Sequence, residues 1–216
     1  MVEAMIYILR VGCPWRDLPN YFGPYSSVFT RWRRWCQRGI WQQILELLTT
    51  LQGGELRYLD ATHIKVHQDG SSGGHQEVQA MGRTKGGLNT KMTAMVDGAG
   101  RALQITVAPG PCADVVAVAA IELPPDKHLV ADKGYDSDAF REDIIAHGGT
   151  PCIPPRKNRL RPISWHRGWY KKRHQVENFF QRIKRWRRVG TRYEKLSLHF
   201  LAFAQLAAVL DWLTSF

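Results

Sequence analysis

The sequence has few cysteines and no closely spaced pair of them. Its 216 residues contain only Cys13, Cys36, Cys112 and Cys152. Without a C-x-x-C pair, this pattern excludes a zinc knuckle and a disulfide scaffold, and it is typical of a protein in a reducing compartment. We therefore expect a cytoplasmic protein.

The sequence also lacks a long hydrophobic run and a phosphate-binding loop of the P-loop type. The most apolar stretch, 198–213, is interrupted by His199, Gln205 and Asp211 and is too short to span a bilayer. We expect it to form a buried helix and expect no membrane contact. The glycine-rich segment 82–87 has no G-K-[ST] at the required spacing, so it reads as a flexible basic loop.

Acidic residues are almost absent from one part of the chain. Residues 151–193 contain fourteen Lys or Arg and one acid, Glu177. The rest of the chain has sixteen basic and eighteen acidic residues, whereas the whole chain carries +11. The excess positive charge therefore lies in one stretch, and such a stretch favours contact with a polyanion, above all a nucleic acid.

The first 53 residues have the pattern of a small helical region. Apolar periodicity predicts helices over 1–11, 26–38 and 40–51, with Gly39 breaking the last two apart. Helix, short glycine break and helix is compatible with a DNA-binding helix-turn-helix, and equally with a three-helix bundle. We predict that 1–53 forms a helical, helix-turn-helix-like DNA-binding region.

The first helix begins without an N-cap, as expected if a preceding segment is missing. In that case Met5, Ile8 and Leu9 should be left partly uncovered. This predicts a loosely held N-terminal region on a core that folds from about Gly54 onward, with a protease-sensitive site near 52–54.

Beyond Gly54 the pattern changes to alternating strands and helices. A Gly-rich loop is expected over 68–89 and a turn at 97–100. We predict strands over 55–67, 91–96, 102–107, 128–132 and 150–153, and helices over 114–122, 137–147, 169–189 and 198–212. Strands followed by alternating helices and strands predict an α/β fold, a mixed sheet flanked by helices.

Two aspartates lie in or at the end of apolar strands, where an acidic side chain is unusual. Asp60 lies inside an apolar strand, where an unpaired carboxylate is costly. Asp132 lies where a buried strand ends beside Gly134, a place where α/β sheets expose ligand-binding groups. Each could be a structural, hydrogen-bonded aspartate, but the two together indicate a site.

The third candidate is the lone acid of the basic segment. On a helix starting at 169, Glu177 shares one polar stripe with Arg173, Lys184 and Arg188. The simple alternative is a salt-bridged helix surface, which contributes little stability. Two strand aspartates and this glutamate could instead converge on a pair of Mg²⁺ ions, with Mn²⁺ able to substitute, and promote phosphodiester displacement.

The spacing Tyr170-x2-Arg173-x3-Glu177-x6-Lys184 resembles the Y-(2)-R-(3)-E-(6)-K motif of bacterial insertion-sequence transposases of the DDE class. The blocks 14–19, 82–88 and 131–136 look like those of the insertion-sequence-five group of that family. The turn 110–114 departs from the family's G-Q-x-H-D pattern, because it lacks the His. The resemblance implies an RNase H-like catalytic domain over 54–216, with Asp60, Asp132 and Glu177 as its catalytic and metal-binding triad.

The predicted function is therefore metal-dependent cleavage of double-stranded DNA at an element's ends and transfer of the 3′-OH to target DNA, by a homodimer associated with the bacterial nucleoid. DNA contacts are assigned to Tyr170, Arg173, Lys184, Arg188, Arg83, Lys85 and Lys133. Two alternatives remain open at this point. A nuclease would use the same triad with water as the nucleophile, and an inactive relative would bind DNA without cleaving it.

Overall fold

The computed structural model describes residues 1–50, 54–71, 78–160 and 163–214. Within these ranges, no helix is long and apolar enough to cross a membrane. The predicted cleavage site near 52–54 lies largely outside the described residues, so the predicted domain boundary at residue 53 stays a prediction.

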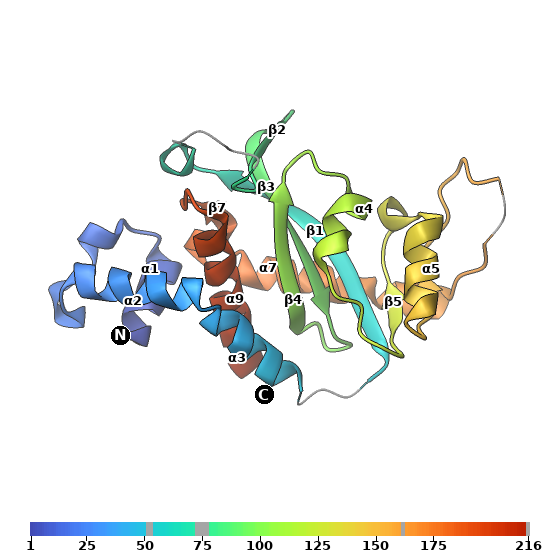
Figure 1. The fold of residues 1–216 in the computed structure, drawn as a ribbon, viewed down its shortest axis with the longest axis horizontal. Helices are drawn as coiled ribbons and strands as arrows, with labels where there is room; N and C mark the ends of the chain where they lie inside the picture. Colours follow the sequence, from blue (N-terminus) through green and yellow to red (C-terminus); the bar gives the residue numbers. More distant parts are fainter. Residues whose placement is uncertain (51–53, 72–77, 161–162, 215–216) are drawn as a thin grey trace.

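A mixed β-sheet forms the centre of the molecule (Figure 1). Its long central strand β1 (Leu56–Val66) pairs antiparallel with β3 (Gly87–Val96) and parallel with β5 (His128–Val130). β4 (Ala102–Pro109) lies beyond β3, and β6 (Pro151–Cys152) lies beyond β5. The order β4-β3-β1-β5-β6, with three antiparallel strands followed by two parallel ones, agrees with the expected RNase H-like sheet.

Two short strands complete the sheet, and neither was predicted. β2 (Gly82–Thr84) forms a hairpin with the beginning of β3. β7 (Thr191–Arg192) pairs with the end of β1 at Lys65 and Val66. Each has only two or three residues, so its position depends on pairing with a distant or longer strand more than on its own periodicity.

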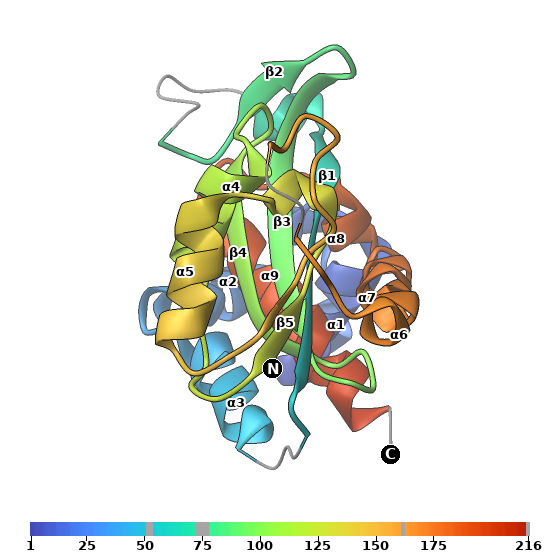
Figure 2. The ribbon, with the colours of Figure 1, turned by 90° about the vertical axis from the view of Figure 1, so that its right-hand side faces the viewer.

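Helices cover both faces of the sheet (Figure 2). α7 (His174–Ile183) and α9 (Ser197–Leu213) lie on one face, whereas α4 (Asp114–Ala117) and α5 (Asp138–Ala146) lie on the other. The apolar stretch expected to be a buried helix is α9, in which Phe200, Phe203 and Trp212 are fully buried. The remaining short helical turns are η1 (Trp15–Asp17), η2 (Asn20–Phe22), η3 (Gln68–Gly70), η4 (Val118–Ala120), η5 (Lys133–Tyr135) and η6 (Lys171–Arg173).

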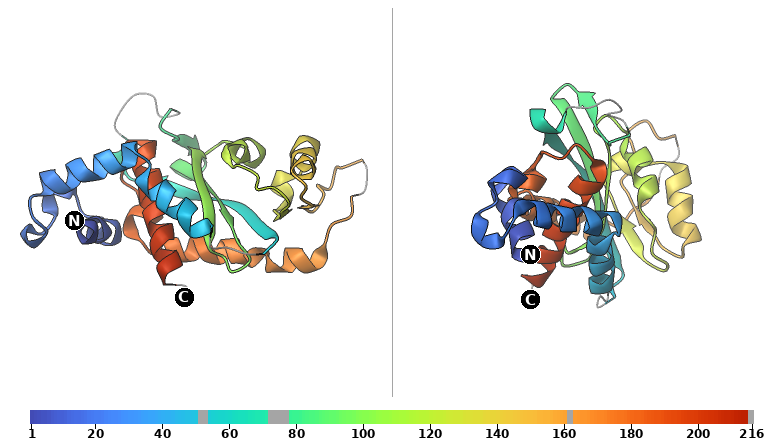
Figure 3. Two further views of the ribbon diagram at one scale, coloured as in Figure 1. Left: turned by 60° about the horizontal axis from the view of Figure 1, so that its bottom comes forward. Right: turned by 60° about the vertical axis from the view of Figure 1, so that its left-hand side comes forward.

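The N-terminal helices lie beside α9 (Figure 3), and their buried side chains belong to the same hydrophobic core as those of the sheet. These helices are α1 (Val2–Val11), α2 (Tyr25–Gln37) and α3 (Ile40–Thr49). Trp32 of α2 stacks on Phe203 of α9, with ring centroids 4.1 Å apart. Met5, Ile8 and Leu9 are each 0% exposed, because α1 packs against α2 and α8 (Arg187–Gly190). The prediction of a partly uncovered apolar face on the first helix is therefore wrong, whereas the predicted loose attachment of the N-terminal region stays a prediction.

The single helix predicted over 169–189 is also wrong. The segment forms α6 (Arg167–Tyr170), the turn η6, α7 and, after an extended residue at Trp186, α8. In one straight helix, Val189 would lie about 220° around the axis from Val176, at 100° per residue. Both side chains are 0% exposed in the structure. The break after α7 allows Val189 to reach the core, where α8 contacts α1.

Candidate active site

Asp60 lies in the middle of the central strand β1, paired with Ala94 of β3. Its Oδ2 accepts a hydrogen bond from Arg173 Nη1 at 2.6 Å, and its Oδ1 accepts one from the backbone N–H of Ala61 at 2.8 Å. Burial raises the pKa of Asp60, although the Ala61 N–H and the Arg173 charge oppose that shift. The strand β1 therefore fixes the position of the Asp60 carboxylate, although burial disfavours the charged form of this group.

Asp132 follows β5, the parallel neighbour of β1, and caps the turn η5. Its Oδ1 accepts a hydrogen bond from the Gly134 N–H at 2.7 Å. The two aspartates lie close enough for the charge of Asp132 to contribute to the raised pKa of Asp60. The structure therefore brings these two predicted residues together at neighbouring strands.

Glu177 is connected to Asp60 by Arg173, which forms hydrogen bonds with both carboxylates. Arg173 Nη2 donates to Glu177 Oε1 while its Nη1 holds Asp60, so one guanidinium links α7 to the central strand. The bidentate planar geometry of Arg suits this bridge. Among the described residues, no three His, Cys, Asp or Glu groups lie close enough to hold a metal ion. The predicted direct convergence of three carboxylates is thus replaced by a convergence through Arg173.

The other residues of the Y-R-E-K spacing lie on the same side of the sheet. Lys184, directly after α7, donates through Nζ to Thr62 Oγ1, two residues along β1 from Asp60. Burial lowers the pKa of Lys184. Tyr170, the last residue of α6, has its ring 5.8 Å from the Arg173 guanidinium carbon. Asp60, Thr62 and these three side chains therefore form one polar row between β1 and the α6–α7 segment.

The donor set suits a hard divalent cation. Asp132 uses Oδ1 for its own turn and Glu177 uses Oε1 for Arg173, and within the described residues each keeps its second oxygen available. Carboxylate oxygens are the ligands that Mg²⁺ and similar ions prefer. A bound ion would compensate the charge that burial disfavours at Asp60. The residues therefore fit such an ion, provided that Arg173 releases Glu177.

A second ion pair, missed by the sequence reasoning, lies beside Asp132. Lys91 of β3 is 6% exposed, and its Nζ donates to Asp114 Oδ1 at 2.7 Å. A Cβ on Gly134 would stand 2.8 Å from Asp132 Oδ1 and 2.9 Å from Asp114 Oδ2, which places both acids next to this glycine. The sequence could have indicated this ion pair, because a lysine inside an apolar strand needs a carboxylate partner for the same reason that Asp60 needs a cation.

A buried tyrosine borders the same acids. The hydroxyl of Tyr135 is buried and has no hydrogen-bond partner within the described part of the chain. Burial raises the pKa of Tyr135, and the charges of Asp114, Asp60 and Asp132 raise it further. The phenol therefore stays protonated and can donate a hydrogen bond into the acidic site.

Arg188 does not have the DNA-binding role that the sequence predicted. It is 5% exposed, its Nη1 pairs with Glu194, and its Nη2 donates to the backbone oxygen of Cys13 at 2.6 Å. The helical projection failed here because α7 ends before Arg188 and the chain turns into the core. Arg188 joins the C-terminal segment to the N-terminal region.

The remaining predicted DNA contacts are exposed. Arg83 and Lys85 lie at the β2–β3 hairpin, at one end of the sheet (Figure 2). Lys133 lines a cavity of about 300 Å³ together with Asp132, Arg156 and Lys157. Arg156 also donates to the Gly134 oxygen at 2.7 Å, so it braces the turn that carries Asp132. These placements leave the side chains accessible to phosphates, and their DNA-binding roles stay predictions.

Residues 52–212, more than half of the chain, match the family model described as Transposase DDE domain. The chain belongs to the DDE transposase family. Residues 1–45 match a second model, Putative transposase of IS4/5 family. The resemblance noted in the sequence is thus confirmed for both parts of the transposase.

Three relatives extend this result. The transposase is 34% identical over 131 residues to a putative transposase for insertion sequence element IS6501 from Brucella ovis, covering 58% of this chain and 99% of the relative. It is 33% identical over 67 residues to the uncharacterized protein y4sN of Sinorhizobium fredii, covering 31% of this chain and 54% of the relative. It is 40% identical over 50 residues to an uncharacterized 16.2 kDa protein of insertion element IS402 from Burkholderia cepacia, covering 22% and 33%. No solved structure matches the chain.

Membership of this family makes the protein an enzyme that acts on DNA, and the family generally uses divalent metal ions.

Proposed function

We propose that Asp60, Asp132 and Glu177 are the catalytic triad with which this transposase cuts a DNA strand at the end of an insertion sequence and joins the resulting 3′-OH to target DNA. The observation that supports it best is the Arg173 bridge, in which Arg173 binds Asp60, 113 residues earlier in the sequence, and at the same time Glu177. Asp132, directly after the neighbouring strand β5, completes the group.

The three acids are proposed to bind Mg²⁺, with Mn²⁺ able to substitute. When bound, such ions activate the attacking oxygen and stabilise the leaving oxygen of a phosphodiester. The residues of the chain supply the remaining parts. Asp60 presents its carboxylate from the central strand and Asp132 from the cap of the turn η5. Arg173 exchanges Glu177 for a phosphate, which it can hold with two parallel hydrogen bonds.

Tyr170, Lys184 and Lys133 are proposed to contact the DNA strand beside the cut, whereas Arg83 and Lys85 contact phosphates farther along. Such contacts fix the position of the duplex and carry little sequence information. We propose a homodimer on DNA because an element has two ends to be cut. Its place of action is then the nucleoid in the cytoplasm, where the substrate is.

The test is a cleavage and strand-transfer assay on labelled element ends in Mg²⁺. Asp60→Asn, Asp132→Asn and Glu177→Gln should each lower the cleavage rate by about three orders of magnitude or more, as expected when members of one catalytic unit are removed, and should leave DNA binding nearly unchanged. Glu142→Gln, an exposed acid on α5, is the matched control. Near-full cleavage by any triad variant would remove that residue from the triad, and cleavage without joined products would indicate a nuclease.

A further inference from the structure

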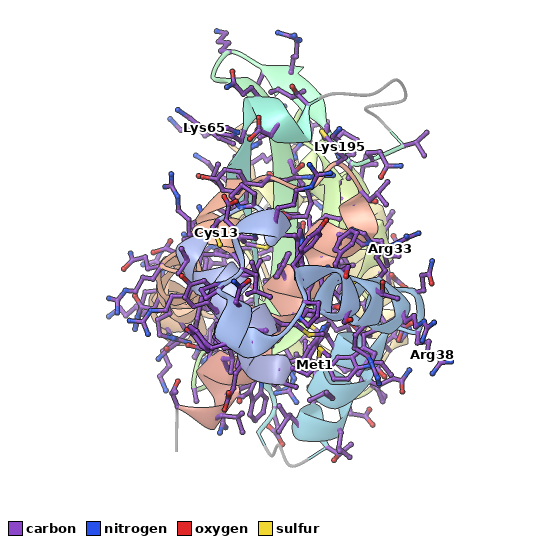
Figure 4. The ribbon with its side chains drawn as sticks, turned by 90° about the vertical axis from the view of Figure 1, so that its left-hand side faces the viewer. Met1, Cys13, Arg33, Arg38, Lys65 and Lys195 are labelled. Carbon is purple, nitrogen blue, oxygen red and sulfur yellow. The ribbon has the colours of Figure 1, made fainter. Side chains whose placement is uncertain are left out.

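A cavity of about 540 Å³ lies where the N-terminal region meets the segment after β7. Its walls include the aromatic side chains Trp15, Phe29, Tyr193 and His199. Figure 4 is turned to this face, which carries Cys13, Arg33 and Lys195 from three separate segments. The volume falls in the range of small-molecule sites, which are mostly apolar with a few fixed polar groups.

The buried polar groups of the cavity are the ion pair of Arg188 and Glu194, and the exposed carboxylate of Asp69 also lines it. Glu194 is 7% exposed, and its Oε1 accepts from Arg188 Nη1. Its other oxygen, Oε2, has no hydrogen-bond partner among the described residues. A buried carboxylate oxygen without a donor is costly. A ligand that presents an N–H group to Glu194 would therefore satisfy this oxygen, once a rotation of the side chain turns the buried Oε2 toward the cavity.

The rim of the cavity is positively charged on one side. Arg33 of α2 and Lys195 are exposed and line the cavity, and neither has an ion-pair partner within the described ranges. Burial lowers the pKa of His199, and the charge of Arg33 lowers it further. The imidazole thus stays neutral at pH 7 and offers a flat, uncharged ring. The cavity combines aromatic walls, one buried acceptor, two exposed cations and one exposed acid, Asp69, which pairs with His67.

We propose that this cavity binds one unstacked nucleotide of single-stranded DNA. The base would stack on the aromatic walls, an exocyclic amino group would donate to Glu194 Oε2, and the phosphate would face Arg33 and Lys195. Aromatic stacking and a carboxylate that accepts from a base amino group are established modes of nucleotide recognition. The inference rests on the proposed function in that DNA is taken as the partner of the protein.

The cavity is distant from the triad along β1. Asp69, which lines the cavity, follows the end of β1 at Val66. Six residues of strand separate Asp60 from Val66, which at about 3.3 Å per residue corresponds to about 20 Å. This length corresponds to roughly six base-pair steps of B-form DNA at 3.4 Å per step. The nucleotide in the cavity would therefore be a different one from the nucleotide that is cut.

The test compares two double variants that each remove two positive charges. Arg33→Ala/Lys195→Ala removes the rim of the cavity, whereas Arg10→Ala/Arg34→Ala removes two exposed arginines that do not line it. Fluorescence anisotropy measures the affinity for single-stranded oligonucleotides of adenine, cytosine or thymine. The rim variant should bind about tenfold more weakly than the control variant. Equal losses in both would overturn the proposal.

The proposed contact between Glu194 and a base amino group is tested separately, by the preference of the protein among oligonucleotides. Thymine has no exocyclic amino group, so oligo(dA) and oligo(dC) should bind the wild-type protein about tenfold more tightly than oligo(dT). Glu194→Gln should abolish this preference, because an amide can both donate and accept, and thermal melting checks that the variant is folded. A wild-type protein without the preference would refute the base contact. Free dAMP and dCMP, added as competitors, show whether a single nucleotide is sufficient.

These results can be separated from those for the proposed function. Asp60→Asn should keep the oligonucleotide preference while it loses cleavage. Loss of the preference with intact cleavage in the wild-type protein would refute the cavity alone. A persistent preference in a wild-type protein that never cleaves would refute the triad alone.

Discussion

The strand carboxylate Asp60 illustrates a conflict between stability and chemistry in this site. Its burial raises its pKa even though Arg173 is within hydrogen-bonding distance. The fold thus maintains a group whose charge it does not fully stabilise. Active sites commonly carry such strain, because a well-compensated group would gain little from a ligand.

The first prediction follows from the sign of that shift. Below the ordinary aspartate value of 3.8, the carboxyl is protonated in both the folded and the unfolded chain, so the wild-type protein and Asp60→Asn should be equally stable. As the pH rises through the raised pKa of the folded state, only the wild-type protein must bury a charge, and it loses stability relative to the variant. At pH 7.5 without divalent ions, Asp60→Asn should melt about 2–4 °C higher, which corresponds to about 1 kcal/mol for a chain of this size.

Calorimetry from pH 3 to pH 8 checks this prediction. Adding Mg²⁺ should raise the melting temperature of the wild-type protein and reduce the difference, because a ligand stabilises the state that binds it. An Asp60→Asn variant that is less stable than wild type at pH 7.5 would show that the Arg173 ion pair outweighs burial.

Among the secondary-structure elements, the turn η5 sets the position of two acids. Gly134 lies next to both Asp132 and Asp114, and its φ is not in the left-handed region. The backbone at this position therefore tolerates any residue, and only the missing side chain is required. Arg156 holds the same turn from outside through the Lys133 and Gly134 oxygens.

The second prediction is that Gly134→Ala lowers cleavage without unfolding the protein. The added methyl group would stand within 3 Å of both carboxylates and must displace them, and a shift of about 1 Å at a reacting group can cost about 100-fold in rate. Gly98→Ala is the matched control, since a Cβ there meets nothing within 4 Å. Equal cleavage rates for the two variants would mean that the Asp132–Asp114 spacing is not part of the chemistry.

The sequence predicts those helices and strands whose buried residues recur at a single regular spacing, either that of a helix or that of a strand. The central strand, the β3–β4 hairpin, α5 and α9 were all expected near their observed positions. The segment 169–189 was not, because a helical projection cannot register that Val189 must reach a core made by α1. For the same reason Arg188 was placed on DNA, whereas it is buried against Glu194.

The site was predictable where a charge interrupts an apolar run. Asp60 and Asp132 were identified as candidate site residues in this way. Lys91 in β3 shows the same pattern, but the sequence analysis did not identify it. The Arg173 bridge was partly visible, since its spacing to Glu177 is local. Its contact with Asp60 joins residues 113 positions apart, and no local pattern specifies such a contact.

At the scale of the whole molecule, the N-terminal helices and the sheet share one core. Trp32 is 0% exposed and stacks on Phe203 of α9, a helix that also contacts β4 and α7. Arg188 joins the same parts through Cys13 and Glu194. The two regions matched by separate family models should therefore unfold together.

The third prediction tests that coupling. Trp32→Ala should lower the free energy of unfolding by about 3–5 kcal/mol and should weaken hydrogen-exchange protection in β3 as much as in α1. Arg31→Ala, an exposed neighbour on α2, is the control and should change neither. Two separate calorimetric transitions in the wild-type protein, or a loss of protection confined to α1, would restore the idea of an independent N-terminal domain.

The shared core has a consequence for the order in which the chain is made. Trp32 is synthesised before Phe203, its stacking partner, which lies 171 residues further along the chain. At about 5–20 residues per second, the ribosome needs roughly 8–30 s to synthesise the chain between α2 and α9. During this interval the first helices carry an apolar surface with nothing to cover it. The nascent transposase is therefore exposed to aggregation and to chaperones until α9 has left the ribosome.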